Sequence, residues 1–341
     1  MNSRKPLLSI VIKTLNEELK IGKAIESALA VEAEIGREVE IIVADSVSTD
    51  RTVAIASDYP VWIVQFVNPA ERGCGAGVQL GYQHSHGEFV YFLDGDMEIA
   101  PGFMTAALAE LARNPKLGGI GGIVEDTRIQ NDVDRIRVNN RTVSTAGFSN
   151  WLEGGGLYRR TALDAVGRYA ADRNLRGFEE AELGMRIRTA GWQLMRLPIK
   201  AVAHTGHSLD TISIFLRHWR SRRAMSAGVL LRGAIGRRWL AEAVRMLIHP
   251  LATLAWWVGF LFLALTDGAM RSPLLLAWVS AGVLAIFGLL LRKRDLRHVL
   301  VSVFSWHYGF AAIIVGLLES RIDPETPIES RILSDKAACN A

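Results

Sequence analysis

Two aspartates separated by one glycine, Asp94-Gly95-Asp96, directly follow the apolar run Glu88–Leu93. Carboxylates that leave a buried strand through a single glycine form a short, rigid chelating turn. Mg²⁺ and similar divalent cations take oxygen ligands of this kind and bridge to substrate phosphates. The spacing therefore indicates a site for a metal bound to a diphosphate, although Asp-Gly is also a common dipeptide of tight turns.

A second pair of carboxylates, Glu179 and Glu180, begins the helix-like segment Glu179–Ala190. Acidic residues in the first turn of a helix stabilise its dipole without any further role. The pattern alone therefore leaves open whether this pair takes part in chemistry.

Short apolar runs alternate with helix-like segments in the first third of the chain. The expected strands are Leu7–Ile12, Val39–Ala44, Val61–Val67 and Glu88–Leu93. The expected helices are Glu17–Ile35, Asp50–Ser57, Gly75–His84 and Pro101–Arg113. This alternation predicts an α/β fold, a mainly parallel sheet flanked by helices on both faces.

Polar clusters follow three of the expected strands: Thr14–Glu17, Asp45 and Asp94–Asp96. In open α/β sheets, ligands bind outside the carboxyl ends of the strands. We therefore expect the three clusters to converge on one ligand. No GxGxxG follows the first strand and no Walker P-loop is present, which weakens dinucleotide-binding and NTPase hypotheses.

Three long apolar runs occupy the last third of the chain: Leu247–Leu265, Pro273–Leu291 and Val299–Leu318. Each is close to the roughly 20 residues that span a bilayer. Basic residues concentrate before the first run and between the second and third, and they mark cytoplasmic loops. Three spans then predict a cytoplasmic N-terminal domain and a C-terminal tail on the opposite side of the membrane.

The formal net charge is +4, but basic residues cluster between Arg217 and Arg245, just before the first apolar run. A basic stretch at this place indicates attraction to anionic lipid headgroups rather than nucleic acid binding. The only cysteines are Cys74 and Cys339, and two distant cysteines argue against a disulfide framework or a zinc site.

Residues 7–220 resemble the inverting family 2 glycosyltransferases of GT-A fold, a Rossmann-like architecture. The motifs that carry the resemblance occur in the family's order: SIVIKTLNEE, IIVADSVSTDRT, GEFVYFLDGDMEIAPGF, GGGLYRRTALDAVGRY and GFEEAELGMRIRTAGW. Two departures stand out. Val47 replaces the usual glycine, and a β-branched residue resists positive φ. Glu180 replaces the more usual aspartate. The Gln-x-x-Arg-Trp motif of processive synthases is absent.

The resemblance implies roles for individual residues. Those expected to line the nucleotide pocket are Thr14, Asn16, Glu17, Asp45 and Asp94. Those expected to hold Mn²⁺ or Mg²⁺ are Asp96, Asp94 and His204, with His207 as a competitor for the histidine. Glu180 takes the position of the general base, with Glu179 beside it.

The segment RHWRSRR supplies the residues expected to meet the acceptor or a lipid phosphate: Arg217, Trp219, Arg220 and Arg223. Arginine suits bidentate contacts to phosphate. An amphipathic helix at the membrane surface, with a lipid-facing tryptophan and solvated arginines, is the alternative interpretation. Both interpretations are compatible with one another.

The expected domain plan has four parts: a cytoplasmic GT-A catalytic domain (1–210), an Arg-rich amphipathic interface segment (211–246), transmembrane helices (247–320) and a polar tail (321–341). The leading hypothesis is a metal-dependent inverting glycosyltransferase of the cytoplasmic (inner) membrane. It would transfer a sugar from a nucleotide donor, expected to be a UDP-sugar, to a hydroxyl of a lipid-linked saccharide. Whether the transmembrane helices form a homo-oligomer is left open.

Three alternatives remain at this stage. A polyprenyl-phosphate sugar synthase would use an anionic phosphate as acceptor and need no base. A processive polysaccharide synthase would need the apolar helices to form a channel. A GT-A scaffold without activity would not need the intact Asp94-Gly95-Asp96 turn or the Glu179–Glu180 pair.

Overall fold

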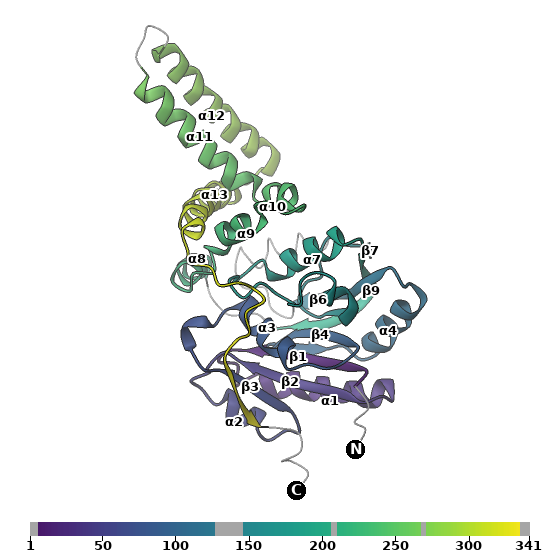
Figure 1. Ribbon diagram of the computed structural model, residues 1–341. Helices are drawn as coiled ribbons and strands as arrows, with labels where there is room; N and C mark the ends of the chain where they lie inside the picture. The colour runs from purple at the N-terminus through teal and green to yellow at the C-terminus, as the bar shows by residue number, and fades with distance from the viewer. Residues whose placement is uncertain (1–5, 127–145, 206–209, 267–270, 335–341) are drawn as a thin grey trace. The chain divides into compact units, whose positions relative to one another are not determined.

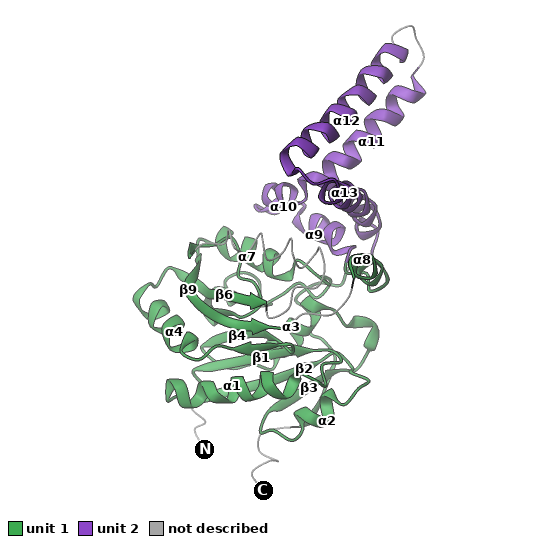
Figure 2. Cartoon of the chain, turned by 180° about the vertical axis from the view of Figure 1, so that it is seen from behind, with its two compact units in different colours: residues 1–223, 320–341 green, residues 224–319 purple. Residues whose placement is uncertain are grey.

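The computed structural model describes residues 6–126, 146–205, 210–266 and 271–334. The chain divides into two compact units, coloured separately in Figure 2. Unit 1 comprises residues 1–223 together with 320–341, and unit 2 comprises residues 224–319.

Ten strands within the described residues form one mixed sheet in unit 1 (Figure 1). Four neighbouring strands run parallel, in the order β3 (Trp62–Phe66), β2 (Val39–Asp45), β1 (Leu8–Thr14) and β4 (Phe89–Asp94). The sheet continues beyond β4 with β8 (Gly156–Arg159), β6 (Leu117–Asp126), β9 (Gln193–His204) and β5 (Met97–Ile99), while β7 (Gly147–Phe148) pairs with β9. The four predicted strands are therefore confirmed, but the second half of the sheet is largely antiparallel.

Helices cover both faces of the sheet, as the alternation predicts. One face carries α1 (Ile21–Ile35), α2 (Thr52–Ala56) and α4 (Phe103–Arg113), and the other carries α3 (Cys74–Gln83), α6 (Arg160–Asp164) and α7 (Glu179–Thr189). Side chains alternate along β1. Ile10 and Ile12 pack into the core on the face of the sheet that α1 covers, and Val11 packs into the core on the face that α3 covers. A Cβ at Gly81 of α3 would lie 2.2 Å from Val11 Cγ1, so only glycine lets α3 pack this closely on β1.

The chain returns to unit 1 after the apolar helices. Strand β10 (Ser330–Ser334) pairs antiparallel with β3 at the edge of the sheet. A chain that leaves one side of a membrane and returns to it crosses an even number of times. Three crossings would place the tail on the side opposite the N-terminal domain, whereas residues 330–334 pair with that domain's sheet; the number of crossings and the side of the tail stay predictions.

Unit 2 is helical: α9 (Ser226–Ala234), α10 (Leu240–Met246), α11 (Ile248–Leu265), α12 (Arg271–Lys293) and α13 (Leu296–Leu317). Three of these, α11 to α13, are long and apolar enough to span a membrane, as predicted. They differ in how they pack. α11 and α12 have almost no fully buried residues, whereas α13 packs on α9, where a Cβ at Gly228 would lie 2.3 Å from the Ile313 carbonyl oxygen.

Candidate active site

The carboxyl ends of three parallel strands bring the predicted polar clusters together. Thr14 of β1 lies opposite Asp45 of β2, and Lys13 of β1 lies opposite Asp94 of β4. Because each strand ends at this edge, its last side chains face the same region as the loops that follow. The three clusters therefore lie at one edge of the sheet, and their binding of a common ligand stays a prediction.

Asp45 is fully buried and is held by three hydrogen bonds. The backbone N–H of Ser48 donates to its Oδ2 at 3.0 Å, the Ser48 hydroxyl donates to Oδ1 at 2.5 Å, and Gln65 Nε2 donates to Oδ2 at 2.6 Å. A buried carboxylate needs such partners to offset its lost hydration. Sequence reasoning found Asp45 but missed Gln65, which lies in an apolar strand.

Two loops that follow β1 and β2 are joined through Asn16. The Asn16 side-chain oxygen accepts from the Thr49 backbone N–H at 2.8 Å, and the Asn16 backbone N–H donates to Ser48 Oγ at 2.9 Å. Asn16 has φ of 56° and Val47 has φ of 61°. Val47 therefore adopts the left-handed conformation that its branched side chain resists, and the hydrogen bonds of the neighbouring Ser48 hold the loop there.

Lys13 joins the two acidic motifs. Its Nζ lies 3.2 Å from Asp94 Oδ1 and 2.9 Å from Glu179 Oε1. Burial alone would lower the pKa of Lys13, but the charges of these two carboxylates raise it well above its ordinary value. Lys13 stays charged and holds the start of α7 against the end of β4. A lysine inside an otherwise apolar strand was the sequence signal for it, and that signal was missed.

The adjacent glutamates of α7 differ in their electrostatics. Burial would raise the pKa of Glu179, but the charges of Lys13 and Arg223 outweigh this effect and lower it. Burial and the nearby Glu179 carboxylate raise the pKa of Glu180 to about 8. Glu179 is thus an ionised anchor, whereas Glu180 is a carboxyl group poised near neutral pH, as a general base requires.

One pocket joins the two motifs. The polar side chains in its wall are Lys13, Asp94, Glu153, Tyr158, Glu179 and Glu180. Gly154 and Gly156 also line it. A Cβ at Gly154 would lie 2.6 Å from Met97 Cε, so a larger residue there would require the Met97 side chain to shift. The pocket places Glu180 and Asp94 around one common space.

The second aspartate of the turn, Asp96, lies next to a histidine. Its Oδ2 is 3.3 Å from His204 Nε2, and His204 Nδ1 is 2.5 Å from Asp126 Oδ1. Asp126 is almost wholly buried. A carboxylate behind a histidine fixes the ring's orientation and tautomer, as is common for histidines that bind metal. Asp126 was missed in the sequence, and His207 lies outside the described residues.

Asp96 and His204 are suited to a divalent cation. Within the described residues, no three His, Cys, Asp or Glu side chains gather to hold an ion alone. Mg²⁺ and related ions are commonly held by one or two carboxylates together with substrate phosphates. The buried Thr14 Oγ1 has no hydrogen-bond partner, and a Cβ at Gly95 would lie 2.8 Å from it. The turn therefore offers oxygen ligands around a space that only glycine leaves open, and the residues fit such an ion.

A second lysine lies beside the Asp94-Gly95-Asp96 turn. Lys20 Nζ is 3.3 Å from Glu17 Oε2, 3.8 Å from Asp96 Oδ2, and donates to the Thr205 carbonyl at 3.0 Å. Burial and the charge of Asp96 raise the pKa of Glu17. Glu17 thus lies close to the Asp94-Gly95-Asp96 turn.

The Arg-rich segment divides into two parts. Arg223 Nη1 lies 3.5 Å from Cys74 Sγ, and its charge acts on Glu179, so it belongs to the site. Helix α8 (Thr211–Arg220) carries Arg217 and Arg220, both exposed. Its exposed apolar residues are Ile212, Leu216 and Trp219. Their spacing places them on one face of the helix, the pattern of a helix that lies on a membrane surface.

Comparisons with known proteins agree with this geometry. Residues 9–165 match the family model described as "Glycosyl transferase family 2". The lipopolysaccharide core biosynthesis glycosyltransferase LpsC of Rhizobium meliloti (strain 1021) is 30% identical over 143 residues, which cover 38% of this chain and 50% of that protein. The undecaprenyl-phosphate 4-deoxy-4-formamido-L-arabinose transferase of Pectobacterium carotovorum subsp. carotovorum (strain PC1) is 33% identical over 98 residues, 28% of this chain and 30% of that protein.

The matched part spans half or less of these relatives. Among solved structures, the mannosyltransferase PcManGT from Pyrobaculum calidifontis, in complex with GDP-Man and Mn²⁺, is similar with a TM-score of 0.58 and 19% identity. The similarity covers 93% of this chain and 88% of that one. At this identity it shows the fold alone.

Proposed function

We propose that this chain, which carries a glycosyltransferase family 2 domain of GT-A-like fold, transfers a sugar from a nucleotide donor to a hydroxyl of a lipid-linked acceptor with inversion. The observation that carries the proposal is the difference in ionisation between Glu179 and Glu180. One carboxylate is ion-paired and ionised, and its neighbour has a pKa near neutrality in the same pocket as Asp94.

Glu180 acts as the general base. Its carboxylate takes the proton of the acceptor hydroxyl as that oxygen attacks the anomeric carbon. The new glycosidic bond forms on the face opposite the breaking bond, and the nucleoside diphosphate leaves with the bonding electron pair. A base with a pKa near the working pH makes this proton transfer efficient, and such a base contributes about 10²- to 10⁴-fold to the rate.

Lys13 and Glu179 position this base. Lys13 anchors Glu179 to the end of β4, so the first turn of α7 is fixed and Glu180 faces the pocket. The Glu179 carboxylate also keeps the pKa of Glu180 high, because two neighbouring carboxylates resist a second ionisation. Replacing Glu179 would therefore change both the position and the basicity of Glu180.

Asp96 and His204 would hold a divalent cation, Mn²⁺ or Mg²⁺, and Asp94 borders the same site. When bound, such an ion neutralises charge that builds on the leaving diphosphate. Lys20 supplies further positive charge beside Asp96. On the other side of the turn, Asp45 and the loop around Asn16 form the pocket for the nucleoside, with a UDP-sugar as the expected donor.

We propose that the acceptor is membrane-bound and that α11 and α12 form a hairpin across the inner membrane. Both helices are long and apolar and have almost no fully buried residues, and two crossings leave residues 330–334 on the side of the catalytic sheet. Basic residues at 292–297 then lie on the cytoplasmic side, as the positive-inside rule requires. Helix α8 would lie at the membrane surface through its apolar face. The relatives named for undecaprenyl-phosphate and lipopolysaccharide core substrates support a lipid-linked acceptor.

A polyprenyl-phosphate sugar synthase is the second candidate, because one relative is named as an undecaprenyl-phosphate transferase. Lys13 and Arg223 would then receive the acceptor's phosphate. A phosphate acceptor is already ionised, so this reaction needs no base. Activity that survives Glu180→Gln but not Arg223→Gln would favour this candidate.

Label transfer in membranes tests the proposal. Membranes containing the chain are incubated with radiolabelled nucleotide sugars and Mn²⁺ or Mg²⁺, and Asp96→Asn membranes serve as the control. We expect label in the organic phase only with the wild-type chain. Label in insoluble polymer would instead favour a processive synthase. If no donor gives label and none binds, the chain is a scaffold without activity.

A further inference from the structure

We infer that Arg331, which follows the apolar helices in the chain, is a positioning residue for the donor nucleotide. The inference rests on the proposed function, because it concerns the nucleoside site proposed beside Asp45. It makes the segment after the membrane helices part of the donor site. Neither the sequence motifs nor the similarity over residues 9–165 includes this segment.

A row of polar side chains crosses four neighbouring strands. Arg331 of β10 is paired in register with Gln65 of β3, Gln65 with Asp45 of β2, and Asp45 with Thr14 of β1. The row begins at the edge of the sheet and ends at the turn that carries Asp94 and Asp96, where a Cβ on Gly95 would touch Thr14. Contacts between the side chains of adjacent strands can therefore link a residue at the edge of the sheet to a buried one.

The hydrogen bonds along this row have one direction. Arg331 donates through Nε to Gln65 Oε1 at 2.9 Å and also donates to it through Nη2. With its oxygen held by the guanidinium, the amide of Gln65 presents its NH₂ group to Asp45, at 2.6 Å. Gln65 and Asp45 are both buried, so a rotated amide would face the carboxylate with its oxygen, and Asp45 would keep only its two hydrogen bonds from Ser48. Arg331 therefore helps to orient Asp45 by holding the Gln65 amide in the donating orientation.

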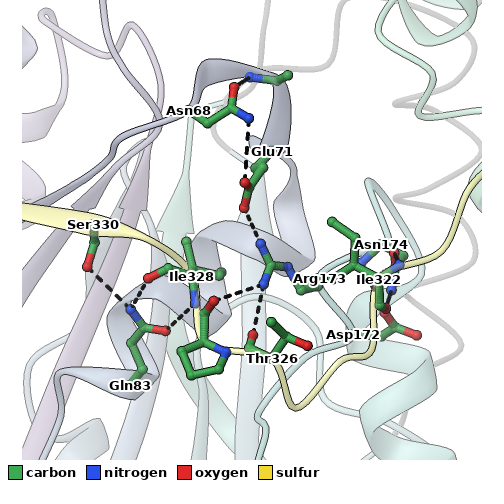
Figure 3. Close-up of polar contacts among 12 residues, drawn as sticks. Asn68, Glu71, Gln83, Asp172, Arg173, Asn174, Ile322, Thr326, Ile328 and Ser330 are labelled. Carbon is green, nitrogen blue, oxygen red and sulfur yellow. Dashed lines mark hydrogen bonds and ion pairs between the residues drawn. The ribbon is translucent and has the colours of Figure 1, made fainter.

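The segment that carries Arg331 is held by several hydrogen bonds to the rest of unit 1 (Figure 3). Gln83 pairs with Ile328 through two hydrogen bonds, from Nε2 to the carbonyl at 2.8 Å and from the backbone N–H to Oε1 at 3.0 Å. Arg173 Nη1 donates to the Thr326 carbonyl at 2.8 Å, and the side chain of Ile328 is buried in the core. Asn174 exchanges two more bonds with Ile322. These contacts lie outside the Gln65 row, so they hold the segment in place when Arg331 is replaced.

Direct binding measurements test this role. Calorimetry gives the Kd of UDP and of GDP, each with Mn²⁺, for the detergent-solubilised full chain. We expect Arg331→Gln to raise the Kd of the nucleotide that binds by about tenfold, the effect of losing a charge-assisted hydrogen bond. Arg331→Lys should recover part of this loss. Arg321→Gln is the matched control, because Arg321 attaches the same segment to Asp172 at 3.0 Å without touching Gln65.

A double-mutant cycle separates positioning from a structural role. In a Gln65→Leu background, Arg331→Gln should change the Kd no further, because its route to Asp45 is already absent. A Kd unchanged by Arg331→Gln, or raised equally by Arg321→Gln, would overturn the inference and leave the proposed function standing. If the wild-type chain bound neither nucleotide, the proposed function would fail and this inference with it.

Discussion

Replacing Glu180 by glutamine should abolish transfer and yet make the fold more stable. Glu180 has a folded-state pKa of about 8, raised from an ordinary 4.5 mainly by burial and then by Glu179. The folded state therefore binds a proton that the unfolded state releases between these values. Stability falls as pH rises through this window, and the penalty at pH 7 is at most about 3 kcal/mol. Glutamine is neutral and does not carry this penalty.

Thermal unfolding of the detergent-solubilised chain between pH 5 and pH 8 measures the effect. For a domain of this size, about 1 kcal/mol shifts the midpoint by about 2–4 °C. The midpoint of Glu180→Gln should thus exceed that of the wild type by several degrees at pH 7, and the difference should shrink towards pH 5. A difference that does not depend on pH would refute the assignment of a raised pKa to Glu180.

The adjacent residue is the matched control. The pKa of Glu179 is lowered by Lys13 and Arg223 against the effect of burial, so its ionised form stabilises the folded state above its ordinary pKa. Glu179→Gln removes one of the two carboxylates that form ion pairs with Lys13 and should lower the midpoint at pH 7. Glutamine is thus expected to raise the unfolding midpoint at pH 7 when it replaces Glu180 and to lower it when it replaces Glu179. A general loss of helix stability would give the same sign at both.

Three further outcomes are expected. Asp126→Asn should weaken Mn²⁺ binding about 10- to 100-fold in paramagnetic relaxation measurements, because His204 loses the carboxylate that orients it; unchanged affinity would remove His204 from the metal site. Gly95→Ala should lower stability by about 1–3 kcal/mol in denaturant unfolding, because its Cβ would lie 2.8 Å from Thr14 Oγ1; wild-type stability would contradict this packing. In right-side-out vesicles that contain a variant chain without its native cysteines, an impermeant maleimide should label Thr266→Cys and not Ser334→Cys; label at both positions would favour three crossings over two.

The sequence predicted the parallel half of the sheet well because each strand there is a short apolar run buried on both faces. The antiparallel half was not predicted. Strand β6 has the sequence LGGIGGIVED, and its glycines are poor strand formers. In the structure they allow close packing, since a Cβ at Gly119 would lie 2.7 Å from the Tyr158 ring. Tertiary contacts decided the conformation of this segment.

The candidate site was predicted where one motif carries the chemistry, and missed where distant residues meet. Asp94, Asp96 and Glu180 stand in recognisable motifs. Gln65 and Arg331 are 266 positions apart, and only strand pairing brings them together. The branched Val47 put the loop geometry in doubt, but hydrogen bonds to the adjacent Ser48 maintain its positive φ. These features depend on register and packing, which no local pattern records.

The rate of sugar transfer by Glu180→Gln membranes tests the central claim most directly. Wild-type and variant membranes receive the same labelled donor, metal ion and endogenous acceptor, and chain amounts are equalised. The account predicts a loss of at least about 100-fold in the variant, with the chain still folded and still binding the nucleotide. It also predicts that the wild-type rate falls as pH decreases below the pKa of Glu180. A variant that transfers at nearly the wild-type rate would contradict the assignment of Glu180 as the base.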